Sequence, residues 1–243
     1  MKIRLDILRR DSSEAAPYTQ SFIYETDDEN ATVATALCDI NSQAVIRDAE
    51  GNAAKPIKWQ CSCLQKKCGA CAMVINSKPR LACDAALKEF EKSGCVSLGP
   101  LRKFKNVADL MVDRSVMFDN LKALGAWLDD KTKADERTLD TAYDASRCLQ
   151  CGCCLEVCPN FYPEGEFCGM SAAAPMSRLI AAMPKAQQRK AYKQYRAHIY
   201  EGCGKSLACR DICPAGIDID AMLVNSNAAA VWKRRAWRKR GSD

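Results

Sequence analysis

The chain has 243 residues, which is enough for one large domain or two small ones. Its formal net charge of +6 comes without a nucleic-acid-binding module, so nucleic acid is not expected as a partner. It contains 16 cysteines, far above ordinary usage, and these require a collective explanation as disulfides, zinc sites or iron-sulfur clusters.

The first hundred residues are expected to be mainly β structure. Apolar and polar residues alternate over 2–9, which is the pattern of a half-buried strand, and 18–25 is a second strand candidate. Thr32 is a plausible N-cap for a helix that follows it. Further strands are expected at 72–75 and 95–98. The N-terminal segment also lacks the apolar core of a signal peptide, so we expect a reducing compartment, in which disulfides are rare.

Four cysteines in this region have the spacing C-x4-C-x2-C-x11-C, which is typical of a plant-type 2Fe-2S site. Gly69 lies where the loop needs a residue that tolerates positive φ while backbone amides approach the cluster. Cys61 offers a competing register, but its spacing fits less well, and a zinc ribbon or unrelated thiols are the remaining alternatives. The predicted ligands are Cys63, Cys68, Cys71 and Cys83.

From Val107 onward the pattern is helical, because apolar residues recur at three- and four-residue spacings. We therefore predict an α+β protein with a β domain over 1–103 and a helical domain over 104–243. The most apolar stretch, 169–183, is too short to cross a bilayer. The residues that carry the helical pattern are Leu110, Met111, Phe118, Leu121, Leu124 and Leu128.

The helical region contains an internal repeat of cysteine runs. The first run is C-x2-C-x2-C-x3-C-P, and the second lies 55 residues further on. In two-cluster ferredoxins the fourth cysteine of such a run binds the neighbouring cluster. This exchange predicts a 4Fe-4S site with the ligands Cys148, Cys151, Cys154 and Cys213, and a second site with the ligands Cys158, Cys203 and Cys209.

The second site lacks one thiolate, because Ser206 stands where the repeat of Cys151 would place a cysteine. An iron without a soft ligand is readily lost, so this site is predicted to hold a 3Fe-4S cluster. Ligation of a fourth iron by the serine oxygen is the alternative. Pro159 and Pro214 follow the last cysteine of each run and turn the chain away from the clusters.

The remaining side chains carry no catalytic signature, so no catalytic residue is predicted. His198 lies in a tyrosine-rich helical stretch and is expected to be structural. The basic segment 233–240 could face anionic lipid, an acidic partner subunit or solvent. Five cysteines outside the ligand sets are expected to be buried free thiols, two of them beside ligands where they could tune a potential: Cys38, Cys61, Cys95, Cys153 and Cys168.

With three cluster motifs in this order, the chain closely resembles the iron-sulfur subunits of the succinate dehydrogenase and fumarate reductase family. The resemblance covers nearly the whole chain. It is carried by 68–76 with Leu81-Ala-Cys83, by 98–101 with 109–113, and by both cysteine-proline runs. It implies an N-terminal β-grasp ferredoxin domain followed by an α-helical ferredoxin domain.

The resemblance also implies partners. In that family the subunit lies between a flavoprotein that carries FAD and a membrane anchor that carries the quinone site and, in some members, haem b. Single electrons then pass between flavin and quinone through the 2Fe-2S, 4Fe-4S and 3Fe-4S clusters. The implied location is the cytoplasmic face of the membrane, held there by the anchor. The resemblance does not indicate whether succinate oxidation or fumarate reduction is the physiological direction.

The chain departs from the family pattern at the quinone end. Many members have tryptophan shortly after the first cysteine-proline pair and histidine directly after the next cysteine. Here the two neighbourhoods, which include Pro159, Tyr162 and Lys205, read Pro159-Asn-Phe-Tyr-Pro163 and Cys203-Gly204-Lys205, where Tyr162 could replace the tryptophan in part and nothing replaces the histidine. These three are the candidate quinone-side residues. The alternative functions are a subunit of a soluble, thiol-linked fumarate reductase, or a non-enzymatic carrier or sensor resembling a ferredoxin.

Overall fold

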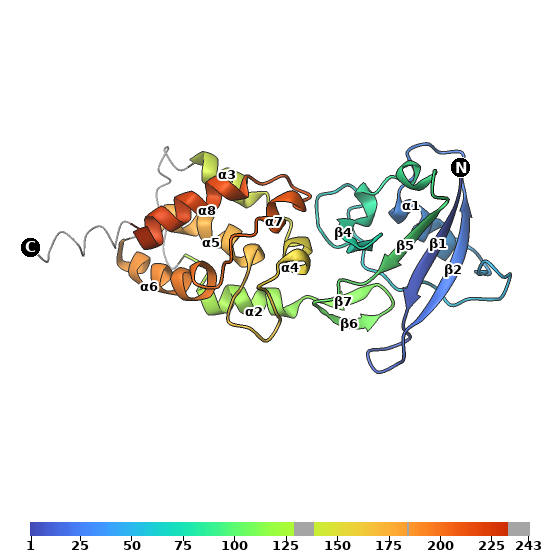
Figure 1. Ribbon diagram of the computed structural model, residues 1–243, viewed down its shortest axis with the longest axis horizontal. Helices are drawn as coiled ribbons and strands as arrows, with labels where there is room; N and C mark the ends of the chain where they lie inside the picture. Colours follow the sequence, from blue (N-terminus) through green and yellow to red (C-terminus); the bar gives the residue numbers. More distant parts are fainter. Residues whose placement is uncertain (129–138, 184, 233–243) are drawn as a thin grey trace, which may run out of the picture. The chain divides into compact units, whose positions relative to one another are not determined.

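The computed structural model describes residues 1–128, 139–183 and 185–232 (Figure 1). The chain forms two compact units, each described here by itself. Unit 1 comprises 1–114 and 151–156, and unit 2 comprises the rest. The basic segment 233–240 lies outside the described residues. The domain limits predicted from the sequence, 1–103 and 104–243, stay predictions.

Unit 1 is built on a five-stranded mixed sheet with the order β2-β1-β5-β3-β4. β1 pairs antiparallel with β2 and parallel with β5, and β3 pairs antiparallel with both β4 and β5. Alternation in β1 buries Ile3, Leu5 and Ile7 completely, as the sequence predicts. The strands are β1 (Lys2–Arg9), β2 (Tyr18–Glu25), β3 (Ala72–Ile75), β4 (Lys78–Leu81) and β5 (Cys95–Gly99).

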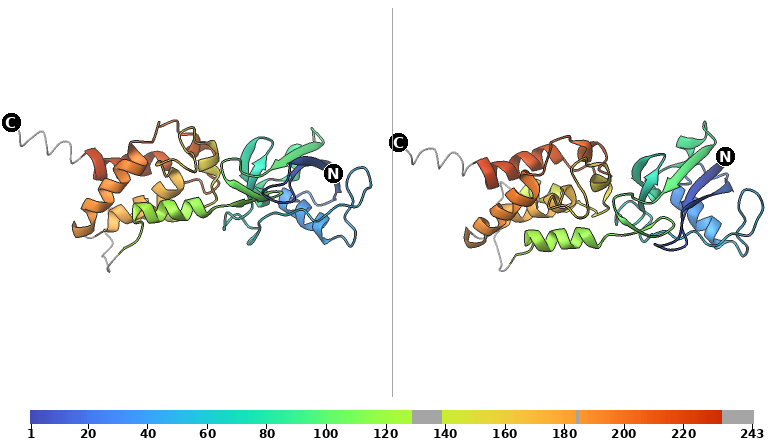
Figure 2. Two further views of the ribbon diagram at one scale, coloured as in Figure 1. Left: turned by 90° about the horizontal axis from the view of Figure 1, so that it is seen from below. Right: turned by 60° about the horizontal axis from the view of Figure 1, so that its bottom comes forward.

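One helix, α1 (Val33–Ser42), lies beside this sheet in two views (Figures 1 and 2). The predicted cap is confirmed, since Thr32 Oγ1 accepts from the Thr35 amide at 3.2 Å and Thr35 Oγ1 accepts in return from the Thr32 amide. Leu37 and Ile40 are buried on the inner stripe. Two short 3-10 helices, η1 (Ala82–Asp84) and η2 (Leu87–Phe90), complete the connection between β4 and β5.

The helical pattern predicted from Val107 onward is wrong for its first residues. β6 (Lys105–Ala108) and β7 (Met111–Asp113) form an antiparallel hairpin instead, and α2 begins only at Ser115. The turn residue Asp109 has a φ of 41° and is 2% exposed. Its carboxylate accepts from Arg9 Nε at 2.9 Å and from two backbone amides. These bonds require the hairpin, because a buried carboxylate must be fully paired.

Unit 2 is helical, and the order of its elements can be followed in Figure 1. Among the described residues, no helix is both long enough and apolar enough to cross a membrane. The helices from residue 115 onward are α2 (Ser115–Leu124), α3 (Leu139–Ser146), α4 (Cys153–Val157), α5 (Met170–Ala182), α6 (Lys185–Tyr195), α7 (Ala208–Asp211) and α8 (Ile219–Asn227), with π-helical segments η4 (Arg196–Tyr200) and η5 (Ala228–Trp232). Most of α4 belongs to unit 1.

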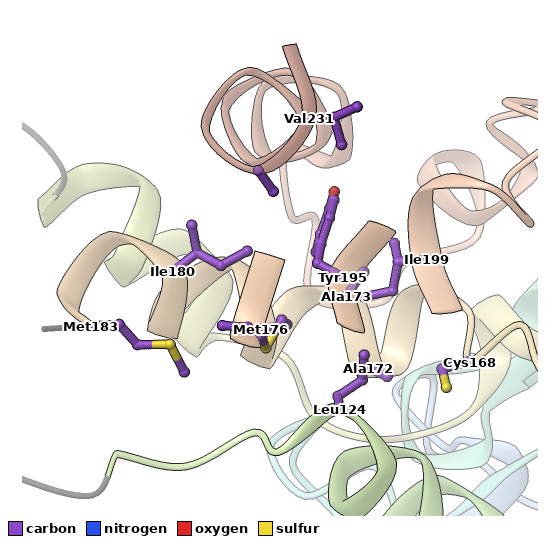
Figure 3. Packing of buried hydrophobic residues seen from close by; sticks show 12 residues of the cluster. Leu124, Cys168, Ala172, Ala173, Met176, Ile180, Met183, Tyr195, Ile199 and Val231 are labelled. Atoms are coloured by element: carbon purple, nitrogen blue, oxygen red, sulfur yellow. The ribbon is translucent and has the colours of Figure 1, made fainter. Parts of the chain in front are cut away.

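Two hydrophobic clusters fill unit 2. The larger gathers side chains of α5, α6, η4 and η5 around Met176 and Tyr195 (Figure 3), and Tyr195 Oη donates to Asn227 Oδ1 at 2.9 Å. The smaller is formed by α3, α5 and α8 with Ile217. Several cysteines of the two runs pack against the smaller cluster. This cluster therefore connects the helical core to the candidate ligands.

Candidate functional site

The first group of cysteines lies in the loop before β3 and in η1. Backbone amides of the loop point at its sulfur atoms: Gln65 N and Lys67 N lie 3.4 and 3.3 Å from Cys63 Sγ, and Lys66 N lies 3.2 Å from Cys83 Sγ. Cys71 Sγ lies 3.4 Å from Cys83 Sγ. Cys83, far along the chain, is thus brought to the loop. Cys71 and Cys83 are thus in contact, the amides of one loop reach both Cys63 and Cys83, and Cys68 hydrogen-bonds with Cys63.

The loop conformation explains this donor pattern. Leu64, Lys66 and Gly69 have φ values of 53°, 59° and 74°, which turn successive amides to the inside. Donation from the Gln65 and Lys67 amides lowers the pKa of Cys63 to about 7, whereas burial raises the pKa of Cys71 to about 12. Soft thiolates stabilised by amide donors form a donor set that suits an iron-sulfur cluster.

The first helical run turns into α4 at a glycine. Gly152 has a φ of 86°, and a Cβ atom there would lie 2.8 Å from Phe104 Cζ. Cys151 is 8% exposed, and the adjacent Cys153 thiol hydrogen-bonds to it and lowers its pKa to about 7. Glu156 of α4 accepts from Arg102 Nε and from the Lys103 amide, both at 3.0 Å. These bonds hold α4 within unit 1.

In unit 2, hydrogen bonds join the segment before Cys148 to the segment after Cys213. The Arg147 guanidinium donates to the Ala215 carbonyl and, at 2.7 Å, to Asp144. Asp144 also accepts from the Asp218 amide at 2.8 Å. Cys148 and Cys213 pack against the same hydrophobic cluster. Cysteines 65 residues apart, one from each run, therefore pack against the same cluster.

A second bridge joins the segment after Cys158 to the segment before Cys203. Asn160 Nδ2 donates to the Gly202 carbonyl at 2.8 Å. Burial raises the pKa of Cys209 to about 11, and the nearby Cys158 and Cys203 sulfurs contribute to the same shift. Cys158 of the first run and Cys203 of the second are thus both close enough to act on Cys209. Ser206 is exposed in the loop before α7.

The three candidate quinone-side residues have different surroundings. Pro159 is exposed and Tyr162 is 61% exposed. Lys205 has a φ of 56°, and its ammonium lies 5.6 Å from the centre of the Tyr200 ring. Lys205 also lines a cavity of about 340 Å³ with Cys203 and Trp232, whereas Pro159 and Tyr162 do not.

The cysteines outside the ligand sets differ in burial. The expected burial is confirmed for Cys153 and Cys168, while Cys38 and Cys95 are partly buried. It is wrong for Cys61, which is exposed at the start of the loop whose amides turn toward Cys63 instead. His198 Nδ1 lies 3.0 Å from the Glu166 carbonyl oxygen. In the described ranges, no three His, Cys, Asp or Glu side chains converge on a single metal ion.

Sequence reasoning missed the residues that hold the runs in place. These residues bond carbonyl, amide or guanidinium groups of segments far away in the chain, and the spacing of cysteines carries no information about them. The missed residues are Asp144, Arg147, Glu156 and Asn160.

Two family models match the two parts of the chain that contain the cysteine groups. Residues 4–119 match the 2Fe-2S iron-sulfur cluster binding domain, and residues 144–217 match the 4Fe-4S dicluster domain. The second match spans both cysteine runs. The α+β fold class, a 2Fe-2S ferredoxin domain followed by a helical domain with two cysteine runs, is therefore confirmed.

Similar proteins extend over most of the chain. The succinate dehydrogenase iron-sulfur subunit of Bacillus subtilis is 37% identical over 93% of this chain and 91% of its own length. The fumarate reductase iron-sulfur subunit of Wolinella succinogenes is 30% identical over 64% of this chain and 70% of its own length. A chain of the Mycobacterium smegmatis Sdh1 complex in the apo form has the same fold, with a TM-score of 0.71 at 17% identity over 94% and 95% of the two chains. The chain belongs to the family of iron-sulfur subunits of succinate dehydrogenase and fumarate reductase, which are parts of an oxidoreductase complex.

Proposed function

We propose that this chain is the electron-transfer subunit of a succinate:quinone oxidoreductase or quinol:fumarate reductase complex. It would hold three clusters between FAD on a partner flavoprotein and a quinone at a membrane anchor. The proposed ligands are Cys63, Cys68, Cys71 and Cys83 for 2Fe-2S, Cys148, Cys151, Cys154 and Cys213 for 4Fe-4S, and Cys158, Cys203 and Cys209 for 3Fe-4S.

Two hydrogen-bond bridges support the proposed exchange of the fourth cysteine between the two runs. One bridge, from Arg147 to Ala215, joins segments next to Cys148 and Cys213. The other, from Asn160 to Gly202, joins segments next to Cys158 and Cys203. A ligand set taken from each run alone would need neither bridge. The pairing across the repeat therefore agrees with the local contacts of unit 2.

This chain would supply the cluster ligands, the hydrogen-bond donors to their sulfur atoms, and the burial of the sites. Bound clusters of these types accept and release single electrons, which the side chains of this chain do not do by themselves. Amides of Gln65, Lys66 and Lys67 point at the sulfur atoms of Cys63 and Cys83, which stabilises negative charge at the first site. At the second, Cys153 donates to Cys151. No residue of the described chain is proposed to handle the dicarboxylate, whose site would belong to the flavoprotein.

The quinone-side end is proposed to lie near the third ligand set. Lys205 is the best supported of the three candidates, since it lines the same cavity as Cys203 and the partly exposed Trp232. Tyr162 offers an exposed phenol, and Pro159 follows the ligand Cys158 directly. An anchor subunit would then hold this chain at the cytoplasmic face of the membrane.

Low-temperature EPR with iron and sulfide analysis on the anaerobically purified complex tests the cluster set. We expect a reducible 2Fe-2S signal, a fast-relaxing 4Fe-4S signal and a 3Fe-4S signal in the oxidised state. Ser206→Cys should weaken the 3Fe-4S signal and add a cubane, because it restores the missing thiolate.

Ser12→Cys is the matched control, since it adds an exposed thiol in a turn of unit 1. It should leave all three signals unchanged. Zinc in place of iron, or two cubanes in the unmodified complex, would contradict the proposed cluster set. An unchanged 3Fe-4S signal in Ser206→Cys would contradict the role given to position 206.

A further inference from the structure

Arg114, directly after β7, has contacts that neither the fold nor the ligand sets explain. Its guanidinium donates from Nη1 to Gln60 Oε1 and from Nη2 to the carbonyl oxygens of Ala70 and Ala72, both at 3.2 Å. These carbonyls flank the ligand Cys71. Nε is buried and has no hydrogen-bond partner within the described residues. A buried N–H without an acceptor is costly unless another group supplies one.

The same guanidinium is within electrostatic reach of both groups of cysteines in unit 1. Burial lowers its pKa, and the sulfur atoms of both groups, Cys151 foremost, act in the opposite direction. Cys68 and Cys71 are proposed 2Fe-2S ligands, and Cys151 is a proposed 4Fe-4S ligand. An arginine stays cationic throughout the physiological pH range.

We propose that Arg114 is a positioning residue whose fixed positive charge raises the reduction potential of both the 2Fe-2S and the 4Fe-4S site. This inference rests on the proposed function. Reduction adds one negative charge to a site, so a nearby buried cation stabilises the reduced form. The carbonyls of Ala70 and Ala72 fix that charge beside Cys71, and the unpaired Nε–H remains available for a sulfur acceptor.

The hydrogen bonds to the carbonyls of Ala70 and Ala72 place the guanidinium beside the proposed 2Fe-2S ligand Cys71. Loss of the charge should therefore shift the reduced-to-oxidised ratio of the 2Fe-2S centre about tenfold toward the oxidised form at a fixed potential, which corresponds to 59 mV for a one-electron couple. The 4Fe-4S centre should shift in the same direction.

The test is an EPR-monitored redox titration of the purified complex with Arg114→Gln and Arg114→Lys. Arg114→Gln should lower both potentials. Arg114→Lys keeps the charge and should remain closer to the unmodified protein. Arg47→Gln is the matched control, because Arg47 is an exposed arginine of unit 1 whose side chain donates to the Gly51 carbonyl, away from the cysteines. It should leave both potentials unchanged.

Gln60→Glu gives a second measurement if Arg114→Gln does not assemble its clusters. It keeps Arg114 and places a carboxylate against the guanidinium, so it should also lower the potentials. Unchanged potentials in a cluster-replete Arg114→Gln or Gln60→Glu protein would overturn this inference alone, as would an equal fall in Arg114→Lys and Arg114→Gln. Absence of either cluster from the unmodified protein would overturn the proposed function and this inference with it.

Discussion

Gly51 and Gly152 have almost the same backbone conformation but different surroundings. Their φ values are 87° and 86°. A Cβ atom on Gly51 would meet nothing within 4 Å, whereas one on Gly152 would lie 2.8 Å from Phe104 Cζ. Gly152 is therefore required for two reasons, its left-handed conformation and the approach of a buried ring. The second reason connects the ligand turn at Cys151 to the residues that follow β5.

Alanine substitutions at these two glycines separate the cost of backbone strain from the cost of a packing clash. Gly51→Ala should cost about 1–2 kcal/mol from strain alone, and Gly152→Ala should cost at least about 1 kcal/mol more because the Phe104 ring must move. The midpoint of thermal unfolding of each purified variant measures the difference. Equal midpoints would show that the Phe104 contact does not limit position 152.

At the scale of elements, hydrogen bonds from side chains hold together segments that the ligand assignment treats as one site. Asp144, near the end of α3, accepts from Arg147 and from the Asp218 amide at the start of α8. The Asp218 side chain in turn caps α8 by accepting from the Ala221 amide at 3.0 Å. One carboxylate thus links two helices on either side of the Cys148 and Cys213 positions.

Asp144→Ala should weaken the 4Fe-4S site selectively. The variant leaves the Asp218 amide and the Arg147 guanidinium without this acceptor, a loss of about 0.5–1.5 kcal/mol because both bonds are exposed to water. We expect a lower yield of the 4Fe-4S signal by EPR spin quantitation, with the 2Fe-2S signal retained as an internal standard. Asp119→Ala is the control, because Asp119 pairs with Lys122 on the exposed side of α2. A parallel loss of both signals would argue against a local role for Asp144.

In the hairpin of β6 and β7, a tertiary contact overrides the local sequence pattern. Leu110 and Met111 fit a helical spacing, yet Asp109 takes a positive φ and pairs with the buried Arg9. Breaking such a pair costs several kcal/mol, which exceeds any helix propensity of the neighbouring residues. Periodicity counts apolar positions only, so it could not detect a partner 100 residues away.

At the scale of the whole molecule, the proposed ligands of unit 2 pack into a hydrophobic cluster, whereas the sheet of unit 1 has a core without them. The sheet of unit 1 has its own core, in which Ile3, Leu5 and Ile7 are completely buried. In unit 2, Cys148, Cys209 and Cys213 pack directly against the smaller hydrophobic cluster with α8. Metal binding contributes to folding where the ligands belong to the core.

Removal of iron by chelation under reducing conditions should therefore loosen α8 before the sheet. Hydrogen exchange should show faster exchange of amides in Ile219–Asn227, while amides of β1 and β5 keep their protection. The sheet serves as the reference within the same molecule. Uniform loss of protection across both units would indicate that they unfold together and that the smaller cluster does not depend on its cysteines.

The sequence by itself determined the α+β class, most strands of the first sheet, and the order of the cysteine motifs. These follow from local patterns: alternation in β1, the cap at Thr32, and the fixed spacing that a cluster imposes on its ligands. The substitution of Ser206 within the repeat was equally visible, because it needs only a comparison of two short segments.

Only the tertiary structure decided which residues support those motifs. The bridges from Arg147 to Ala215 and from Asn160 to Gly202, and the contacts of Arg114 with the carbonyls around Cys71, join residues that are 42 or more positions apart. Such contacts depend on where the backbone carbonyls lie after folding. A carbonyl is present at every position of the chain, so its role as a partner cannot be predicted from residue type.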